Sequence, residues 1–432
     1  MRPASAMAAI KIRRITDFNM RSKLRELARQ VAEIAAHPAQ KERRELWRRH
    51  NSLRGGRPMV LVSPLCWKEL ISESVYVTAD NSELRPIETY LRHLIFCWNS
   101  IPDDKVTEAV LPIPWVVKWT KDWGVAMERV DSGVPGGAYR WKAAIHDPSD
   151  FDKVTYPEFE LDRPASVTMR EQMEALFGDI LPIRQAGCSW PNGDITNWIV
   201  TSLTQDICFL RGDEQVMMDL IDNPAFIHKA LTFMADGYIK RIQLMEREGM
   251  LALNSCGDYV GSASLGYTDE LPAQGFDAGH VRLKDIWGYV EAQGLPSLSP
   301  AMFEEFILPH AKRILELFGL GYYGCCEPLH DKVRLLKQIA NLRKISISPW
   351  ADAGKAADES GDDCILCVKP NPEILLGESF DLGRCRKTLA SLLGATRGRT
   401  CEIVLKDIMT VHRQPWRLTQ WTEMVMALIR NA

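Results

Sequence analysis

Two adjacent thiols, a carboxylate and an imidazole lie within six residues in the last third of the chain: Cys325, Cys326, Glu327 and His330. Sulfur, imidazole nitrogen and carboxylate oxygen are the ligands that Zn2+ prefers in proteins. An aromatic, strand-like run precedes them, and Pro328 follows at the start of a helical pattern. We therefore predict a metal or reactive-thiol site at Cys325, Cys326, Glu327 and His330. The structural alternative is that the thiols pack as small apolar side chains and that Glu327 and His330 cap a helix.

Polar and ionisable residues also follow other apolar runs that the pattern predicts as strands. These strand ends are Asn254 to Asp258, Ser348 to Asp352, Lys369 to Pro372, and Lys406-Asp407. In a barrel of parallel strands the active site lies where the strands end, so we expect these groups to share one cavity. Each strand end also has a structural alternative. Asp258 can satisfy backbone N–H groups in a turn, Asp352 can cap a helix, and Lys406 can pair with Asp407.

The elements that must position these residues alternate along the chain as strand, polar turn and helix. This alternation favours a parallel sheet, and since no glycine-rich phosphate loop follows any strand, a (β/α)8 barrel is favoured over an open nucleotide-binding sheet. The predicted strands are Met59–Val62, Ala109–Trp115, Leu181–Ala186, Leu251–Cys256, Tyr322–Cys326, Lys344–Ser348, Cys364–Lys369 and Cys401–Lys406. The predicted helices include Pro224–Glu248, a helix that starts at Ser299-Pro300, Pro328–Ile339, Ala353–Ser360, Arg384–Leu393 and Arg417–Ile429.

Residues 1–57 are expected to form a basic helical extension before a barrel domain that spans residues 58–432. Residues 1–55 carry 14 Lys and Arg against 5 Asp and Glu, and Leu24, Leu27, Val31 and Ile34 recur at helical spacing. The region lacks a binding motif and interleaved aromatic residues, which favours a solvated extension over a nucleic-acid-binding arm.

The bulk composition is that of a soluble globular protein. The 432 residues are 46% hydrophobic and 25% charged, and the net charge of −3 gives no reason to expect nucleic acid or a membrane surface as partner. No apolar run approaches the roughly 20 residues that span a bilayer, and the amino terminus does not resemble a secretory signal. Eleven scattered Cys favour reduced thiols and a cytoplasmic location.

Taken in order, the motifs resemble those of the uroporphyrinogen decarboxylase-like superfamily, in a branch near the corrinoid-dependent O-demethylase methyltransferases. The segments that carry the resemblance are Gly261-Ser262, Gly266 to Pro272, Tyr323 to His330, Ser348-Pro349-Trp350, Lys369 to Pro372, and Lys406 to Val411. The resemblance covers roughly residues 60–432. It implies a (β/α)8 TIM barrel and, on the methyltransferase side, a zinc ion at the barrel mouth and a corrinoid carried by a partner protein.

The sequence departs from that family's zinc pattern at two places. The family has His-x-Cys where this chain has Tyr323-Gly324-Cys325, and it has a further Cys where this chain has Lys406-Asp407. Only Cys325 matches the pattern, and Cys326, Glu327 and His330 are our substitutes from ligand chemistry.

These considerations favour a methyltransferase that moves a methyl group from a small methylated donor, an O-methyl compound in the first place and an N- or S-methyl compound as the alternative, to a corrinoid-binding protein. Zinc would act as Lewis acid on the leaving oxygen, Tyr267 or Lys406 would donate a proton, and Asp258 and Asp407 complete the predicted catalytic residues. The predicted substrate-binding residues are Trp287, Tyr323 and Trp350 as an aromatic wall, together with Lys369 and Asn371.

Two alternatives stay open. A metal-independent lyase on the same barrel would use Asp258 to steer protonation and would release CO2 from a carboxylated substrate. A binding protein on an enzyme scaffold would show ligand affinity without turnover. A homodimer is compatible with either function.

Overall fold

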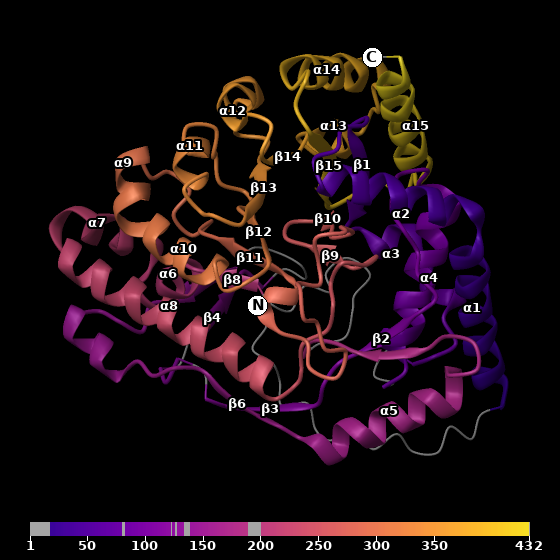
Figure 1. Cartoon of the computed structure of the whole chain (residues 1–432), viewed down its shortest axis with the longest axis horizontal. Helices are drawn as coiled ribbons and strands as arrows, with labels where there is room; N and C mark the ends of the chain where they lie inside the picture. Colours follow the sequence, from indigo (N-terminus) through magenta and orange to yellow (C-terminus); the bar gives the residue numbers. More distant parts are fainter. Residues whose placement is uncertain are drawn as a thin grey trace.

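A parallel sheet of seven strands forms the centre of the computed structural model, which describes residues 18–79, 83–121, 123–125, 128–133, 139–188 and 200–431. The sheet curls, with helices on its outer side (Figure 1). The strand order is β1-β15-β14-β13-β12-β11-β8. The strands are β1 (Met59–Pro64), β8 (Val200–Ser202), β11 (Trp287–Glu291), β12 (Leu320–Tyr323), β13 (Leu342–Ile347), β14 (Ile365–Val368) and β15 (Cys401–Ile408).

Helices connect successive strands of this sheet, as parallel pairing requires. They are α6 (Gln205–Arg211), α7 (Asp213–Asp222), α8 (Pro224–Arg247), α9 (Pro300–Met302), α10 (Leu308–Leu315), α11 (Val333–Leu336), α12 (Ala353–Ser360), α13 (Glu373–Leu376) and α14 (Leu382–Ala395). Helix α15 (Trp416–Arg430) follows the last strand. A π-helical turn, η4 (Phe303–Ile307), joins α9 to α10. Most residues of the central strands are buried, because helices cover one face of the sheet and other segments fill its concave face.

A second hydrophobic cluster lies among the helices of the amino-terminal part. It joins α1 (Phe18–Ala36), α4 (Arg85–Ser100) and α5 (Arg163–Phe177) to the short parallel pair β2 (Leu111–Ile113) and β7 (Ile183–Gln185). Leu24, Leu27 and Val31 of α1 are buried there, so the described part of the basic extension packs into the protein. The remaining elements are α2 (Pro38–Asn51), α3 (Trp67–Leu70), β3 (Val117–Lys121), β4 (Glu128–Asp131), β5 (Tyr139–Lys142), β6 (Glu158–Leu161), and the single turns η1 (Glu73–Val75), η2 (Pro148–Lys153) and η3 (Leu283–Asp285).

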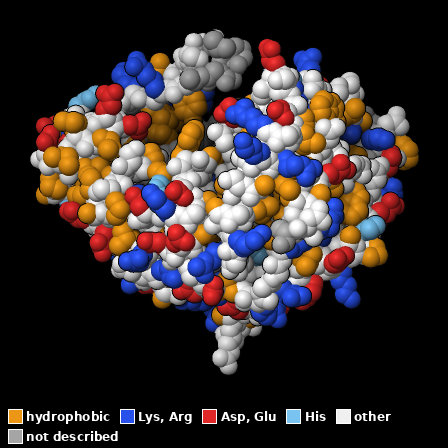
Figure 2. All heavy atoms as spheres, turned by 90° about the horizontal axis from the view of Figure 1, so that it is seen from above, with side chains coloured by type: hydrophobic (Ala, Val, Ile, Leu, Met, Phe, Trp, Pro, Cys, Tyr) orange, Lys and Arg blue, Asp and Glu red, His pale blue; other side chains and the backbone are white. Residues whose placement is uncertain are grey.

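The predicted alternation of strands and helices is confirmed over most of the chain. Helix α8 begins at Pro224 and α12 spans Ala353–Ser360, both as predicted. The strand pairings among the described residues do not close the sheet into a ring, since β2 and β7 pair only with each other. No described helix combines the length and apolar character needed to cross a membrane. Viewed from above, the surface is hollowed between two masses, with hydrophobic side chains in the wall of the hollow (Figure 2).

Two predicted elements are wrong. Residues Leu251–Cys256 form no strand. The side-chain amide of Asn254 makes the hydrogen bonds to β11 that a strand's backbone would make. It donates to Trp287 O at 3.0 Å and accepts from Trp287 N at 2.9 Å. The helix predicted at Pro328–Ile339 is reduced to Val333–Leu336, because Pro328 to Lys332 continue the turn that leaves β12.

A hairpin of β9 (Tyr259–Val260) and β10 (Ser264–Leu265) lies against the concave face of the sheet. At its turn Gly261 has a φ of +61°, and a Cβ atom there would lie 2.2 Å from the ring of Tyr322 on β12. Only glycine combines this left-handed backbone with so close an approach. Deeper along the hairpin, Ser264 accepts a hydrogen bond of 2.6 Å from Lys344 Nζ of β13. The hairpin therefore fills the space inside the sheet.

A fully buried ion pair joins β13 to β15 beneath this hairpin. Lys344 Nζ lies 2.6 Å from Glu402 Oε1, and His50 Nε2 of α2 lies 3.3 Å from the same oxygen. Burial alone would raise the pKa of Glu402, but the charges of Lys344 and the hydrogen bond from His50 hold that pKa at about 2. Burial lowers the pKa of His50, which keeps the imidazole neutral. The pair thus ties the first helices to the centre of the sheet.

Replacing Lys344 with Met is expected to lower the free energy of unfolding by about 3–5 kcal/mol, because it leaves the Glu402 carboxylate buried without its countercharge. Urea denaturation measures this change. The exposed pair Lys142–Glu128 provides the control, since Lys142→Met should cost less than about 1 kcal/mol. The double variant Lys344→Met/Glu402→Leu should recover part of the loss. Equal stability of Lys344→Met and the wild type would refute a structural role for the pair.

Candidate functional site at the carboxyl end of the sheet

Cys325 lies just beyond β12, at the carboxyl end of the sheet. Gly324 has a φ of +92°, and a Cβ atom there would lie 2.4 Å from Leu329, so this glycine allows the chain to turn sharply. The Cys325 Sγ atom then lies 3.5 Å from Cys326 Sγ, 3.4 Å from Ser262 Oγ and 3.7 Å from Lys406 Nζ. Cys325 is half-buried, whereas Cys326 is exposed. The thiol of Cys325 is therefore the sulfur that the rest of the site surrounds.

Two lysines from neighbouring strands converge on this thiol and on the hairpin turn. Lys369, directly after β14, donates to Ser262 Oγ and to the Cys325 carbonyl, both at 2.8 Å, and to the hydroxyl of Ser346. Lys406 of β15 donates to Ser262 Oγ at 3.0 Å. Adjacent strands place both side chains on the concave face, because residues alternate between the two faces of a strand. Ser262 thus links the two ammonium groups.

These contacts favour the thiolate form of Cys325. The hydrogen bond from the Cys326 thiol lowers the pKa of Cys325 most, and the charges of Lys369 and Lys406 with the Ser262 hydrogen bond lower it further, against the opposing effect of burial. The same contact raises the pKa of Cys326. Burial would lower the pKa of Lys406, but the Cys325 and Asp407 charges raise it. Burial lowers the pKa of Lys369, so Lys406 is the ammonium group that faces the Cys325 thiolate at neutral pH.

Two buried carboxyl groups lie at the ends of β11 and β12. Both oxygens of Glu327 accept backbone hydrogen bonds, from Ala292 N at 2.6 Å and from Cys325 N at 2.7 Å. Glu291 accepts from Gln293 N at 2.6 Å and from the Ser202 hydroxyl. Burial and the neighbouring Glu327 raise the pKa of Glu291 to about 9, so its carboxyl group is protonated at neutral pH.

The predicted zinc ligands do not fit a zinc ion in this arrangement. Glu327 turns both oxygens toward backbone N–H groups, and the Lys406 ammonium group lies 3.7 Å from Cys325 Sγ, where it repels a second cation. His330 is half-buried, and its Nδ1 atom has no hydrogen-bond partner among the described residues. No group of three or more His, Cys, Asp or Glu side chains within the described ranges is arranged to hold a metal. Lys406 places a positive charge beside Cys325 instead.

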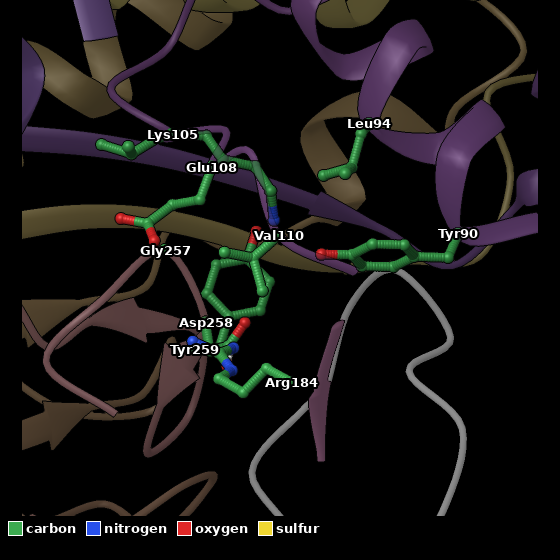
Figure 3. A pocket seen from close by; sticks show the side chains of 10 residues that line it. Tyr90, Leu94, Lys105, Glu108, Val110, Arg184, Gly257, Asp258 and Tyr259 are labelled. Atoms are coloured by element: carbon green, nitrogen blue, oxygen red, sulfur yellow. Dashed lines mark hydrogen bonds and ion pairs between the residues drawn. The ribbon is translucent and has the colours of Figure 1, made fainter. Parts of the chain in front are cut away.

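A polar cavity lies apart from Cys325, near the amino-terminal helices (Figure 3). There Arg184 of β7 forms an ion pair with Asp258 and donates to Cys256 Sγ at 3.3 Å. Tyr90, Lys105 and Glu108 also line this cavity. Asp258, predicted as catalytic, is thus engaged with a guanidinium group, and Arg184 is a residue outside our predicted site.

The other predicted catalytic and binding residues are dispersed. Tyr267 is buried and donates to Glu108, Trp287 is buried with its indole N–H on Gly266 O at 2.8 Å, and Tyr323 is buried against Phe303. Trp350 is 70% exposed. The aromatic wall predicted from Trp287, Tyr323 and Trp350 is therefore not formed.

The remaining polar residues at the strand ends serve local roles. Asn371 accepts from Glu373 N at 3.0 Å, and Asp352 caps α12 by accepting from Lys355 N at 3.0 Å. Asp407 Oδ1 lies 3.6 Å from Lys406 Nζ. Of the predicted residues, the structure brings together Cys325, Cys326, Glu327, Lys369, Lys406 and Asp407.

Sequence reasoning missed Ser262 and Glu291. Ser262 lies in a motif that the sequence singled out, but hydroxyl groups are too common to be chosen without contacts. Glu291 ends the apolar run from Trp287, a position equivalent to the other strand ends. A carboxylate at the end of an apolar, strand-like run was therefore a sequence feature from which Glu291 could have been predicted.

Alkylation of Cys325 by iodoacetamide should depend little on pH, because its pKa is lowered and the thiolate persists as the pH falls. Between pH 8 and pH 6 the rate for free cysteine falls roughly 80-fold, given its pKa near 8.5. We expect less than about a threefold change at Cys325, measured by mass spectrometry of the tryptic peptide 314–332.

In Lys406→Met the rate at pH 6 should fall, since loss of the ammonium charge raises the pKa of Cys325. Lys355→Met, at an exposed lysine, is the charge-matched control. A wild-type profile that follows free cysteine would disprove the thiolate assignment.

No family model matches this chain, and no curated protein matches it. Among solved structures, the chain is similar to a methyltransferase from Methanosarcina mazei, with 11% sequence identity and a TM-score of 0.48. That similarity covers 90% of this chain and 97% of the other.

Proposed function

We propose that this protein is a methyltransferase that takes a methyl group from a small O-methylated substrate at Cys325. The observation that carries the proposal is the Cys325 thiolate at the carboxyl end of a parallel sheet, where the active sites of such folds lie. Its sulfur lies 3.7 Å from Lys406 Nζ, and its carbonyl accepts a hydrogen bond from Lys369. In this proposal the sheet belongs to the (β/α)8 barrel type predicted from the sequence, and the β2–β7 pair lies between β1 and β8.

The chemistry needs a nucleophile and a means to neutralise the leaving oxygen. The Cys325 thiolate attacks the methyl carbon, a sulfur–carbon bond forms, and the carbon–oxygen bond breaks with its electron pair on oxygen. Lys406, whose ammonium group lies 3.7 Å from the sulfur, donates a proton to that oxygen. The products are an S-methyl cysteine and an alcohol or phenol.

The two lysines take the electrophilic role that the sequence assigned to zinc. A fixed positive charge beside the developing alkoxide stabilises the transition state, as a metal would. We retain the corrinoid-binding protein as the proposed partner. Its reduced corrinoid supplies a strong nucleophile that can accept the methyl group and return Cys325 to the thiolate.

A single-turnover experiment with deuterated methoxyaromatic substrates tests this function. Peptide 314–332 should gain one labelled methyl group on Cys325, and the demethylated product should appear in equal amount. Lys406→Met should slow the transfer by about 10²–10³-fold, since it removes the proton donor. Cys325→Ser should abolish it, and Lys355→Met should leave it unchanged. Demethylation that proceeds in Cys325→Ser would exclude Cys325 as the methyl acceptor.

The cavity around Arg184 favours a second candidate, a metal-independent lyase. A guanidinium group is suited to bind a carboxylate, and Arg184 carries its Nε–H buried without a hydrogen-bond partner among the described residues. In that function Asp258, paired with Arg184, would steer protonation after loss of CO2.

Measurement of CO2 release from carboxylated substrates distinguishes the two functions. For a lyase we expect release without an added corrinoid, loss of activity in Asp258→Asn, and full activity in Cys325→Ser. Activity that requires Cys325 would assign the reaction to the thiolate site instead.

A further inference from the structure

The adjacent thiols differ from every other cysteine in the described chain. Cys326 is exposed and Cys325 is half-buried, and their sulfur atoms lie 3.5 Å apart. Of the other nine cysteines, eight are buried and Cys188 is half-buried. This pair is therefore the one in which two neighbouring thiols lie close together and are also accessible to solvent.

We propose that Cys325 and Cys326 form a peroxide-sensitive modification site, in which Cys325 is oxidised by a hydroperoxide and Cys326 then closes a disulfide with it. Sensor cysteines of this kind are accessible thiolates placed next to a resolving thiol. Both features are present here: Lys406 Nζ lies 3.7 Å from Cys325 Sγ, and Cys326 is the exposed neighbour. The proposal does not depend on methyl transfer.

The first step consumes one hydroperoxide. The Cys325 thiolate attacks one peroxide oxygen, a sulfur–oxygen bond forms, and the oxygen–oxygen bond breaks with its electron pair on the departing oxygen. That oxygen takes a proton, for which the Lys406 ammonium is the donor at the site, and leaves as water or an alcohol. Cys325 is thereby oxidised to a sulfenic acid.

The second step forms the disulfide. The sulfur of Cys326 attacks the sulfenic sulfur of Cys325, the sulfur–oxygen bond breaks, and hydroxide leaves with the thiol proton as water. The sulfur atoms must move from 3.5 Å to the bonding distance of about 2.05 Å. The overall change converts two thiols and a hydroperoxide into a disulfide, an alcohol or water, and a further water.

Oxidation would change the charge balance of the site. It removes the thiolate that faces Lys406, and the remaining carboxylate near that lysine is Asp407, 3.6 Å away. Any reaction that uses the Cys325 thiolate would therefore stop until a dithiol reductant restores it.

The tryptic peptide 314–332 provides a direct assay, because Cys325 and Cys326 are its only cysteines. The full-length protein is treated with one equivalent of hydrogen peroxide at neutral pH and then alkylated. The peptide should lose the mass of two hydrogens and accept no alkyl groups, at a rate roughly tenfold above that of free cysteine. Dithiothreitol should restore both alkylation sites.

Single variants separate the two roles. Cys326→Ser should stop at the sulfenic acid, which dimedone traps on Cys325, and Cys325→Ser should leave Cys326 reduced at the same peroxide dose. Lys406→Met should slow the oxidation about tenfold, whereas Lys355→Met should not change it. A wild-type peptide that stays in the dithiol form, or equal oxidation of Cys326 in Cys325→Ser, would overturn the proposal. Because this assay needs no methyl donor, its outcome is independent of the test of methyl transfer.

Discussion

The concave face of the parallel sheet carries charged side chains that need partners, and the β9–β10 hairpin supplies them. Burial of an unpaired charge costs several kcal/mol, so Lys344, Lys369 and Lys406 can point inward only if acceptors meet them there. Ser264 and Leu265 O accept from Lys344, and Ser262 accepts from Lys369 and Lys406. The position of the hairpin, with Gly261 against Tyr322, therefore determines which charges the interior can hold.

The interior of the sheet therefore contains two groups of charged side chains, one around Lys344 and one around Lys406, and their charges are balanced differently. In the first group Lys344 is matched by Glu402, and His50 completes the pair from helix α2. Nearer the carboxyl ends of the strands, Lys406 lies 3.6 Å from Asp407 and 3.7 Å from the Cys325 sulfur. The hydrogen bond from Cys326 and the charge of Lys406 favour the Cys325 thiolate, whereas burial lowers the pKa of Lys369. Pairing of a buried lysine with a negative group thus stabilises the fold at Lys344 and favours a reactive sulfur at Cys325.

The two carboxyl groups near this sulfur have roles other than holding a cation. Glu327 uses both oxygens to hold the backbone of two strand ends, at Ala292 and Cys325. Burial and the nearby Glu327 raise the pKa of Glu291, so that this group adds no negative charge at neutral pH. A thiolate beside the Lys406 ammonium group and the protonated Glu291 is suited to nucleophilic chemistry and to oxidation, since both reactions begin with attack by sulfur.

The sequence by itself determined the succession of strands and helices and the strand ends where chemistry collects. Hydrophobic runs and helix-capping residues suffice to place α8, α12, and the ends at Cys325, Lys369 and Lys406, because these signals are local. Only the tertiary structure decided the partners. Asn254 replaces a strand with side-chain hydrogen bonds to Trp287, Glu327 turns to the backbone, and Ser262 arrives from a hairpin 63 residues before Cys325. Alternation along a strand determines the face a side chain takes, but the group that meets it there depends on long-range packing.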